Sequence, residues 1–120
     1  MDSKIHDLLE AAIEKTERGK LEWAAFDSES FRTRIGSGYL HIQRGSTELS
    51  EDGERFFPRA TYSVQISDSQ GRVVVEDQIT AGFEGSVILS KLFEAARKSA
   101  LATDRVLDDM LHTLRGGPRA

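Results

Sequence analysis

The sequence "TDRVLDDMLHTLRGG" near the C-terminus contains Asp104, Asp108 and His112, which stand four residues apart. Two carboxylates and an imidazole at this spacing lie on one side of a helix, where they are suitable ligands for a metal ion. At about 100° per residue, however, the apolar residues of the segment fall on the opposite side. These residues are Val106, Leu107, Met110, Leu111 and Leu114. The pattern therefore indicates a solvent-exposed polar helix face, and we predict no metal site and no bound cofactor.

A predicted hairpin supplies the second group of residues that could do chemistry. The stretch "FRTRIGSGYLHIQRG" alternates apolar and polar side chains on either side of a glycine-rich turn, which is typical of two antiparallel strands. We predict that its inward side consists of Phe31, Thr33, Ile35, Leu40 and Ile42. We predict that its outward side consists of Arg32, Arg34, Tyr39 and His41, with Arg44 at the edge.

This outward side is locally basic, although the chain as a whole has a formal charge of −4. No acidic residue occurs between Ser30 and Thr47. Arginine forms paired hydrogen bonds with phosphate and carboxylate groups, and the ring of Tyr39 could stack on a base or cover a ligand. The same residue types also serve as ordinary solubilising residues on exposed strands, so both interpretations stay open.

The stretch "GERFFPRA" contains two adjacent aromatic residues, Phe56 and Phe57. On an extended chain their side chains point in opposite directions, so we expect one to enter the core and the other to be partly exposed. An exposed phenylalanine beside arginines has the composition of an anchor at a protein interface. The alternative is a phenylalanine that folds back under its own loop.

Length and composition predict one folded domain. A chain of 120 residues can bury a core of its own, and we assign residues 1–115 to a single domain, with 45–58 as a polar loop and 116–120 as a flexible tail. The chain has no cysteine, which excludes disulfide scaffolds and thiolate sites. Charged residues interrupt every apolar stretch, so we expect a cytoplasmic protein that does not bind membranes. The net negative charge argues against nucleic acid as a partner.

The order of the predicted elements indicates an α+β fold. A helical stripe covers residues 3–18, about five strands follow in a meander, and residues 86–115 are helical with a bend at 101–103. Short connections favour an antiparallel sheet, and the apolar stripes need cover. We therefore predict two layers, with the N-terminal helix and one long or two C-terminal helices packed on one sheet face.

No motif in the chain assembles an acid, a base and an electrophile in one place. We therefore expect a noncatalytic protein-interaction or adaptor module that binds another protein, or itself as a homodimer, through the open sheet face or through Phe56 and Phe57. The alternative is a binder of a small anionic ligand or of nucleic acid through the arginine-bearing face. A third class, an enzyme with His41 as general acid or base, would require a cavity beside that residue.

Overall fold

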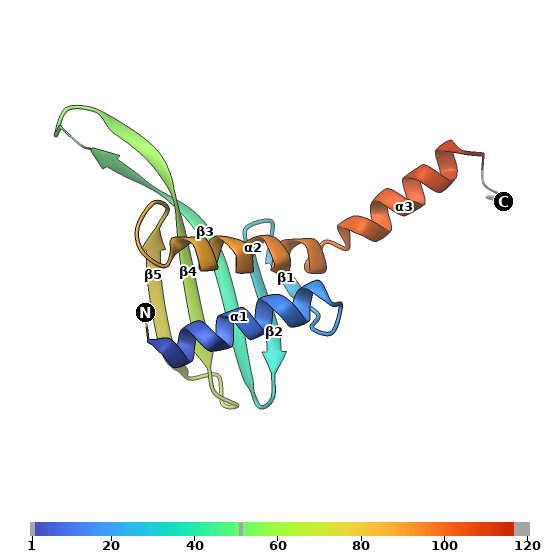
Figure 1. Ribbon diagram of the computed structural model, residues 1–120, viewed down its shortest axis with the longest axis horizontal. Helices are drawn as coiled ribbons and strands as arrows, with labels where there is room; N and C mark the ends of the chain where they lie inside the picture. Colours follow the sequence, from blue (N-terminus) through green and yellow to red (C-terminus); the bar gives the residue numbers. More distant parts are fainter. Residues whose placement is uncertain (1, 51, 117–120) are drawn as a thin grey trace.

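The computed structural model describes residues 2–50 and 52–116, without the side chains of Thr103 and Asp104. An antiparallel sheet of five strands in the order β1-β2-β3-β4-β5 forms one layer, and two helices cover one of its faces (Figure 1). The elements are α1 (Ser3–Glu17), β1 (Ala24–Asp27), β2 (Ser30–Ile35), β3 (Gly38–Ser50), β4 (Phe56–Ser67), β5 (Val73–Thr80), α2 (Ser86–Ala100) and α3 (Thr103–Leu114). The predicted α+β arrangement is confirmed.

The core lies between the sheet and the two helices α1 and α2. Phe31, Ile42 and Val64 lie opposite one another on three adjacent strands, and each is 0% exposed. They form one row of the inward sheet face, as the alternation of apolar residues predicts. The helices contribute the matching side chains, which include Leu9, Ala12, Leu89, Leu92 and Phe93.

The single tryptophan connects α1 to the sheet layer. Trp23 is buried, and its Nε1 donates a hydrogen bond to Thr16 Oγ1 at 2.9 Å. Thr16 Oγ1 in turn donates to the carbonyl of Ala12 at 2.6 Å, so the polar atoms of this buried pair are satisfied. The alternation in the sequence "LEWAAF" at 21–26 predicts a strand over these residues, but β1 begins only at Ala24, after Trp23.

The C-terminal helical region is bent where the sequence predicts a bend. Ala102 has a φ of +49°, a left-handed conformation that interrupts the helix between α2 and α3. Figure 1 shows α3 extending away from the body. The expectation that every C-terminal helix packs on the sheet is therefore wrong for α3, whose described side chains from Arg105 to Leu114 are all exposed.

The segment expected to be a polar loop over 45–58 is mostly strand. β3 continues to Ser50 and β4 begins at Phe56, so the two strands project beyond their neighbours as a long hairpin (Figure 1). Cross-strand pairs continue along it from Gly45 opposite Thr61 to Ser50 opposite Phe56. Backbone pairing stabilises these strands although neither side of the hairpin is buried. The sequence therefore lacks the alternating apolar pattern that would predict them. The tail expected at 116–120 lies outside the described residues from position 117 onwards.

Within the described part of the chain, no helix is long and apolar enough to cross a membrane.

Candidate functional site

The sheet face that α1 and α2 leave uncovered carries a compact group of side chains, which we call the outer-face cluster. Its members are Phe26, Ser30, Arg32, Tyr39 and His41. The strand register brings them together, because Arg32 lies opposite His41 on β3, and Ala24 on β1 lies opposite Arg32. Three of the residues that the sequence assigns to this face thus meet in one place.

The guanidinium of Arg32 lies over two aromatic rings. Its Cζ atom is 4.9 Å from the ring centroid of Phe26 and 4.6 Å from that of Tyr39. Cation–π contacts of this kind hold an arginine in place while leaving N–H groups available to a carboxylate or phosphate. Within the described residues, no carboxylate forms an ion pair with Arg32 or Arg34. The cluster therefore has the chemistry of an anion-binding surface with an aromatic platform.

His41 is held in place by two neighbours. Its Nε2 lies 2.6 Å from Ser30 Oγ, and its ring meets that of Phe26 edge to face at a centroid distance of 5.7 Å. A serine next to a histidine resembles part of a nucleophilic pair, but a nucleophile must be accessible to its substrate. Ser30 is only 6% exposed. The hydrogen bond therefore orients the imidazole on the sheet face.

Arg34 lies on the same sheet face, next to the outer-face cluster. It stands opposite Tyr39 at the end of β2, and its Nε donates to the carbonyl of Gly36 at 3.3 Å in the following turn. The side chain is exposed and adds a second positive charge to the same face.

The sequence interpretation missed Phe26 and Ser30. Phe26 follows Ala24 by two positions on β1, so it shares the outward face with Arg32. Alternation along this strand was therefore a signal that could have identified Phe26. Ser30 was not assigned to the face because it stands at the first position of β2, next to a turn, where the alternation of the strand is not yet visible.

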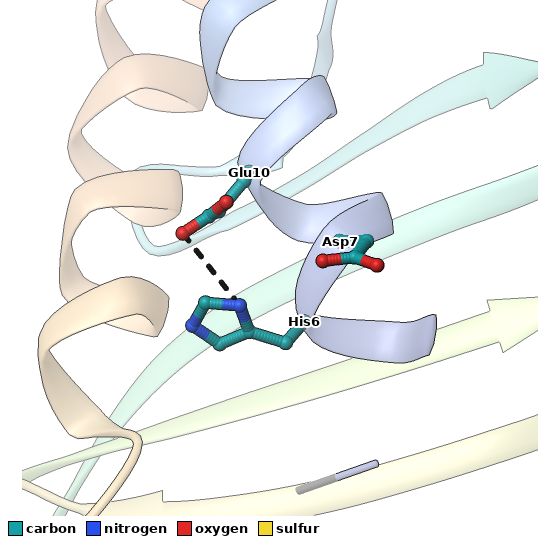
Figure 2. A group of neighbouring side chains, drawn as sticks. All are labelled: His6, Asp7 and Glu10. Atoms are coloured by element: carbon teal, nitrogen blue, oxygen red, sulfur yellow. Dashed lines mark ion pairs between the residues drawn. The ribbon is translucent and has the colours of Figure 1, made fainter. Parts of the chain in front are cut away.

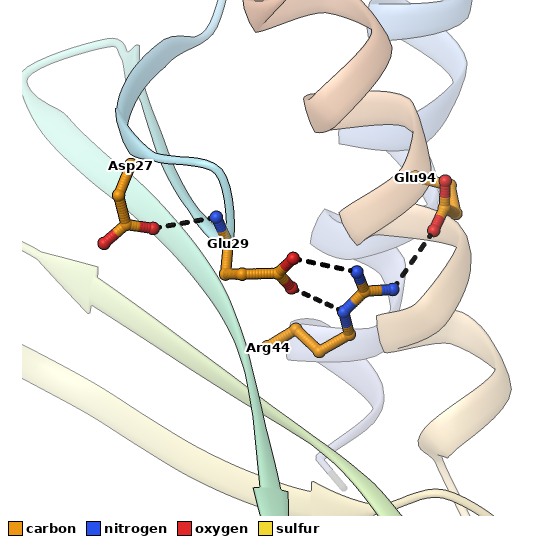
Figure 3. Close-up of polar contacts among 4 residues, drawn as sticks. All are labelled: Asp27, Glu29, Arg44 and Glu94. Atoms are coloured by element: carbon orange, nitrogen blue, oxygen red, sulfur yellow. Dashed lines mark hydrogen bonds and ion pairs between the residues drawn. The ribbon is translucent and has the colours of Figure 1, made fainter.

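Arg44 does not belong to this cluster, which corrects the prediction that placed it at the edge of the outward face. It lies opposite Tyr62 on the helix-covered side, and its Cζ is 4.5 Å from the ring centroid of Phe93. Figure 3 shows its guanidinium between Glu29 and Glu94. The two contacts to the Glu29 carboxylate measure 2.6 and 3.0 Å, and the contact to Glu94 measures 3.6 Å. Arg44 therefore joins the β1–β2 turn to β3 and α2.

This pairing shifts both ionisation equilibria. The hydrogen bond from Arg44 lowers the pKa of Glu29 below its usual value of 4.5, because it favours the charged carboxylate. The same hydrogen bond raises the pKa of Arg44. A lowered carboxylate pKa means that the ion pair stabilises the fold above pH 4.5 and that this stability is lost as the pH falls through the folded-state value.

The substitution Arg44→Met should therefore destabilise the protein by an amount that depends on pH. We expect the difference in unfolding free energy from the wild type to be larger at pH 7 than at pH 3, because Glu29 becomes protonated at the lower pH. Urea denaturation at both pH values measures it. Arg34→Met is the matched control, since Arg34 has no described carboxylate partner. An equal effect of Arg44→Met at both pH values would rule out the ion pair as its cause.

The projecting hairpin forms a second candidate surface, which we call the hairpin pocket. It has a volume of about 310 Å³ and is lined by Leu49, Ser50, Phe57, Arg59, Ala81, Gly82 and Phe83. Phe57 lies opposite Leu49 and contributes to the pocket, whereas Phe56 points to the other side of the hairpin. Both phenylalanines are exposed, at 60% for Phe56 and 50% for Phe57, so the expectation that one enters the core is wrong.

Glycine at position 82 allows the left-handed backbone of the β5–α2 connection beside the hairpin. Its φ is +94°, and a Cβ atom at this position would lie 3.3 Å from the Nη1 atom of Arg59. Any other residue there would be strained and would crowd the guanidinium. The pocket therefore combines apolar walls with one positive charge.

A third surface is the apolar side of α3, which we call the α3 stripe. It consists of Val106, Leu107, Met110, Leu111 and Leu114, whose exposed fractions run from 45% to 83%. On the helix surface His112 lies opposite this stripe, whereas Asp108 lies at its edge, about 60° around the axis from Leu111. Asp108 and His112 are exposed, and the side chain of Asp104 lies outside the described residues, so the geometry of that triplet is not defined.

One described group of side chains has the composition of a metal site. His6, Asp7 and Glu10 follow one another on α1, and their ligand atoms lie within 4.8 Å of each other. Figure 2 shows His6 directed at Glu10, with Nδ1 3.6 Å from Oε1. The side chains of both residues are well exposed, at 46% and 62%. An ion pair at positions i and i+4 on a wet helix surface accounts for the arrangement.

Compared with known protein families, with curated proteins and with solved structures, the chain matches none of them.

Proposed function

We propose that the protein is a noncatalytic protein-interaction module that acts in the cytoplasm. The observation that carries this proposal is the α3 stripe. In α2, the apolar residues Leu89, Leu92 and Phe93 are 0% exposed, whereas α3 leaves five large apolar side chains open to solvent. The core is complete without them. Exposed apolar groups gathered on one element are characteristic of a surface that another protein covers.

Two further features support the proposal. The hairpin pocket places exposed Phe57 and Phe83 next to Arg59, which is the combination of aromatic and arginine side chains that protein interfaces favour. The chain has no cysteine, so its fold does not depend on the oxidising compartment that disulfides require.

The proposal is tested by capturing binding partners with matched baits. The wild type, Leu111→Asp and Phe57→Asp are each immobilised and exposed to cytosol of the host, and retained proteins are quantified by mass spectrometry. We expect at least one partner, or the chain itself, to bind the wild type and to be lost from one variant. Circular dichroism verifies that each bait is folded. Equal retention of every protein by all three baits would refute the proposal.

The outer-face cluster favours a second candidate function, the binding of a small anionic ligand or nucleic acid. The specific observation is Arg32, whose guanidinium lies over the rings of Phe26 and Tyr39 with no described carboxylate to neutralise it. A planar cation beside one exposed and one partly exposed ring suits a ligand with both an anionic group and a flat apolar part. A salt-sensitive affinity for phosphate-bearing ligands would distinguish this function from the first.

A further inference from the structure

We infer that the partner of the α3 stripe is a second copy of this chain, and that each α3 binds the hairpin pocket of the other copy. This inference rests on the proposed function, because it identifies the partner of the same exposed surfaces. It accounts together for two features that the fold of one chain leaves without cover.

Within one chain, α3 has few contacts that would stabilise it as a helix. A helix of 12 residues is marginal in water by itself, since helices of this length gain most of their stability from packing an apolar face. No side-chain hydrogen bond caps α3 at Ala102, and its described residues are all exposed. A partner that buries the α3 stripe would supply the missing packing.

The hairpin pocket and the α3 stripe match in apolar character and in charge. The hairpin pocket has apolar walls from Leu49, Phe57 and Phe83, and Arg59 is the one charged residue among its lining residues. On α3, Asp108 lies at the edge of the α3 stripe, about 60° around the axis from Leu111, and Arg115 lies seven residues, or about 10 Å, further along the same edge, so the acidic contact comes from the N-terminal part of the stripe. An acidic residue flanking an apolar stripe is complementary to an apolar pocket that carries a positive charge.

The hairpin and α3 project in directions that suit a reciprocal pairing of two copies. Figure 1 shows the hairpin and α3 leaving the body on the same side but at opposite ends of α2. A two-fold axis perpendicular to that view, placed above α2, exchanges the two ends, so that in this projection the α3 of each copy overlaps the hairpin of the other. The two contacts are then identical and the assembly closes at two copies.

A reciprocal dimer buries more of the exposed apolar surface than a contact between two copies of α3. A stable interface buries roughly 800 Å² on each partner. In the reciprocal arrangement each chain contributes both its α3 stripe and its hairpin pocket. Pairing of α3 with α3 would use only one of these surfaces and would leave Phe57 and Phe83 exposed. The reciprocal dimer is therefore the arrangement that covers both.

The β4 edge of the hairpin, one of its two free edges, also favours side-chain docking over addition of a strand. The carbonyl of Ala60 accepts a hydrogen bond from the N–H of Ala81, so Ala60 faces the β5 side. By alternation Pro58 faces the same side, where the hairpin extends beyond β5. Proline has no N–H to donate, and proline at such an edge discourages pairing with another strand.

The first experiment measures mass in solution by sedimentation at about 50 µM protein, a concentration that populates complexes of micromolar affinity. We expect a dimer for the wild type. Leu111→Asp and Phe57→Asp should each raise the dissociation constant at least about 30-fold, as expected for the loss of an apolar anchor. The matched controls are His112→Asp, on the opposite side of α3, and Phe56→Asp, on the opposite side of the hairpin. Both should remain dimeric.

Mixing the two disrupted variants distinguishes the reciprocal arrangement from the alternatives. A heterodimer of Leu111→Asp with Phe57→Asp retains one intact contact, between the unchanged α3 of one chain and the unchanged pocket of the other. We therefore expect the mixture to associate more strongly than either variant does alone. If α3 instead pairs with α3, Phe57→Asp remains dimeric from the start, and the inference is wrong.

Cysteine cross-linking tests the contact directly, because the natural chain contains no cysteine. Chains carrying Leu111→Cys and chains carrying Phe57→Cys are mixed and oxidised. A disulfide requires Cα atoms within about 7 Å, so a mixed cross-linked dimer is expected only if α3 reaches the pocket of the other copy. Products that join only identical chains would contradict the inference.

The outcomes also separate this inference from the proposed function. A monomeric wild type that still captures a different protein through Leu111 or Phe57 would overturn the inference and leave the function intact. A monomeric wild type that captures nothing would overturn both.

Discussion

Replacing Phe93 with alanine is expected to remove a large part of the stability of the fold. Phe93 is 0% exposed, and its ring lies 5.4 Å from the ring of Phe31 and 5.9 Å from that of Tyr62. The guanidinium of Arg44 covers the same ring. Truncation of a buried phenylalanine costs about 3–5 kcal/mol, because it removes apolar contacts and leaves a cavity. A domain of this size has only about 5–15 kcal/mol in total.

Urea denaturation followed by the fluorescence of Trp23, at one fixed protein concentration, measures this loss. Phe56→Ala is the matched control, because it deletes the same atoms from a side chain that is 60% exposed. We expect the control to change the unfolding free energy by less than about 0.5 kcal/mol. A loss below about 1 kcal/mol for Phe93→Ala would show that the sheet and α2 do not depend on this contact.

The double substitution Arg32→Glu and Arg34→Glu is expected to abolish any binding of anions by the outer-face cluster. Each hydrogen bond between an arginine and an anion contributes about 1.5–3 kcal/mol. Loss of both interactions should therefore weaken the affinity at least about 100-fold, and the introduced carboxylates would add repulsion. The fold should be unaffected, because both side chains are exposed and neither has a described ion-pair partner.

Fluorescence anisotropy with a set of labelled phosphate-bearing ligands, at about 50 and 200 mM salt, measures this effect. Lys91→Glu with Lys98→Glu is the matched control, because it makes the same change in net charge on the exposed side of α2. If the control pair weakens binding as much, the effect comes from net charge and not from the cluster. If no ligand binds the wild type in a salt-dependent way, the anion-binding function is excluded for that set.

The outward side of the first hairpin could be predicted because strand geometry is local. Side chains alternate along a strand, so the apolar positions of Phe31 and Ile42 place Arg32 and His41 together on the other face. The same rule, applied without exception, places Arg44 inward with Ile42. Alternation along β3 does not reveal the anionic partners that such a half-buried arginine needs, because Glu29 and Glu94 come from other elements of the fold.

The hairpin over 45–60 was harder to predict because its strands bury no side of their own. Thr47 opposite Arg59 and Glu48 opposite Pro58 show no alternation of apolar and polar residues. Backbone hydrogen bonds hold them as strands, and these bonds leave no trace in the pattern of side chains. The hairpin pocket depends in addition on Gly82, which lies far along the chain.

Outside the 45–60 hairpin, the sequence by itself determined the element types, the antiparallel meander, the bend near residue 102 and, with the exception of Arg44, the residues that share each face of the first hairpin, because these follow from periodicity along a single element. Only the tertiary structure decided which apolar stripes are covered. The residues of α2 and α3 have the same helical spacing, yet Leu92 is 0% exposed and Leu114 is 83% exposed. Periodicity identifies the apolar side of a helix. What covers that side depends on contacts with other elements, and for α3 on a second molecule if the proposed dimer forms.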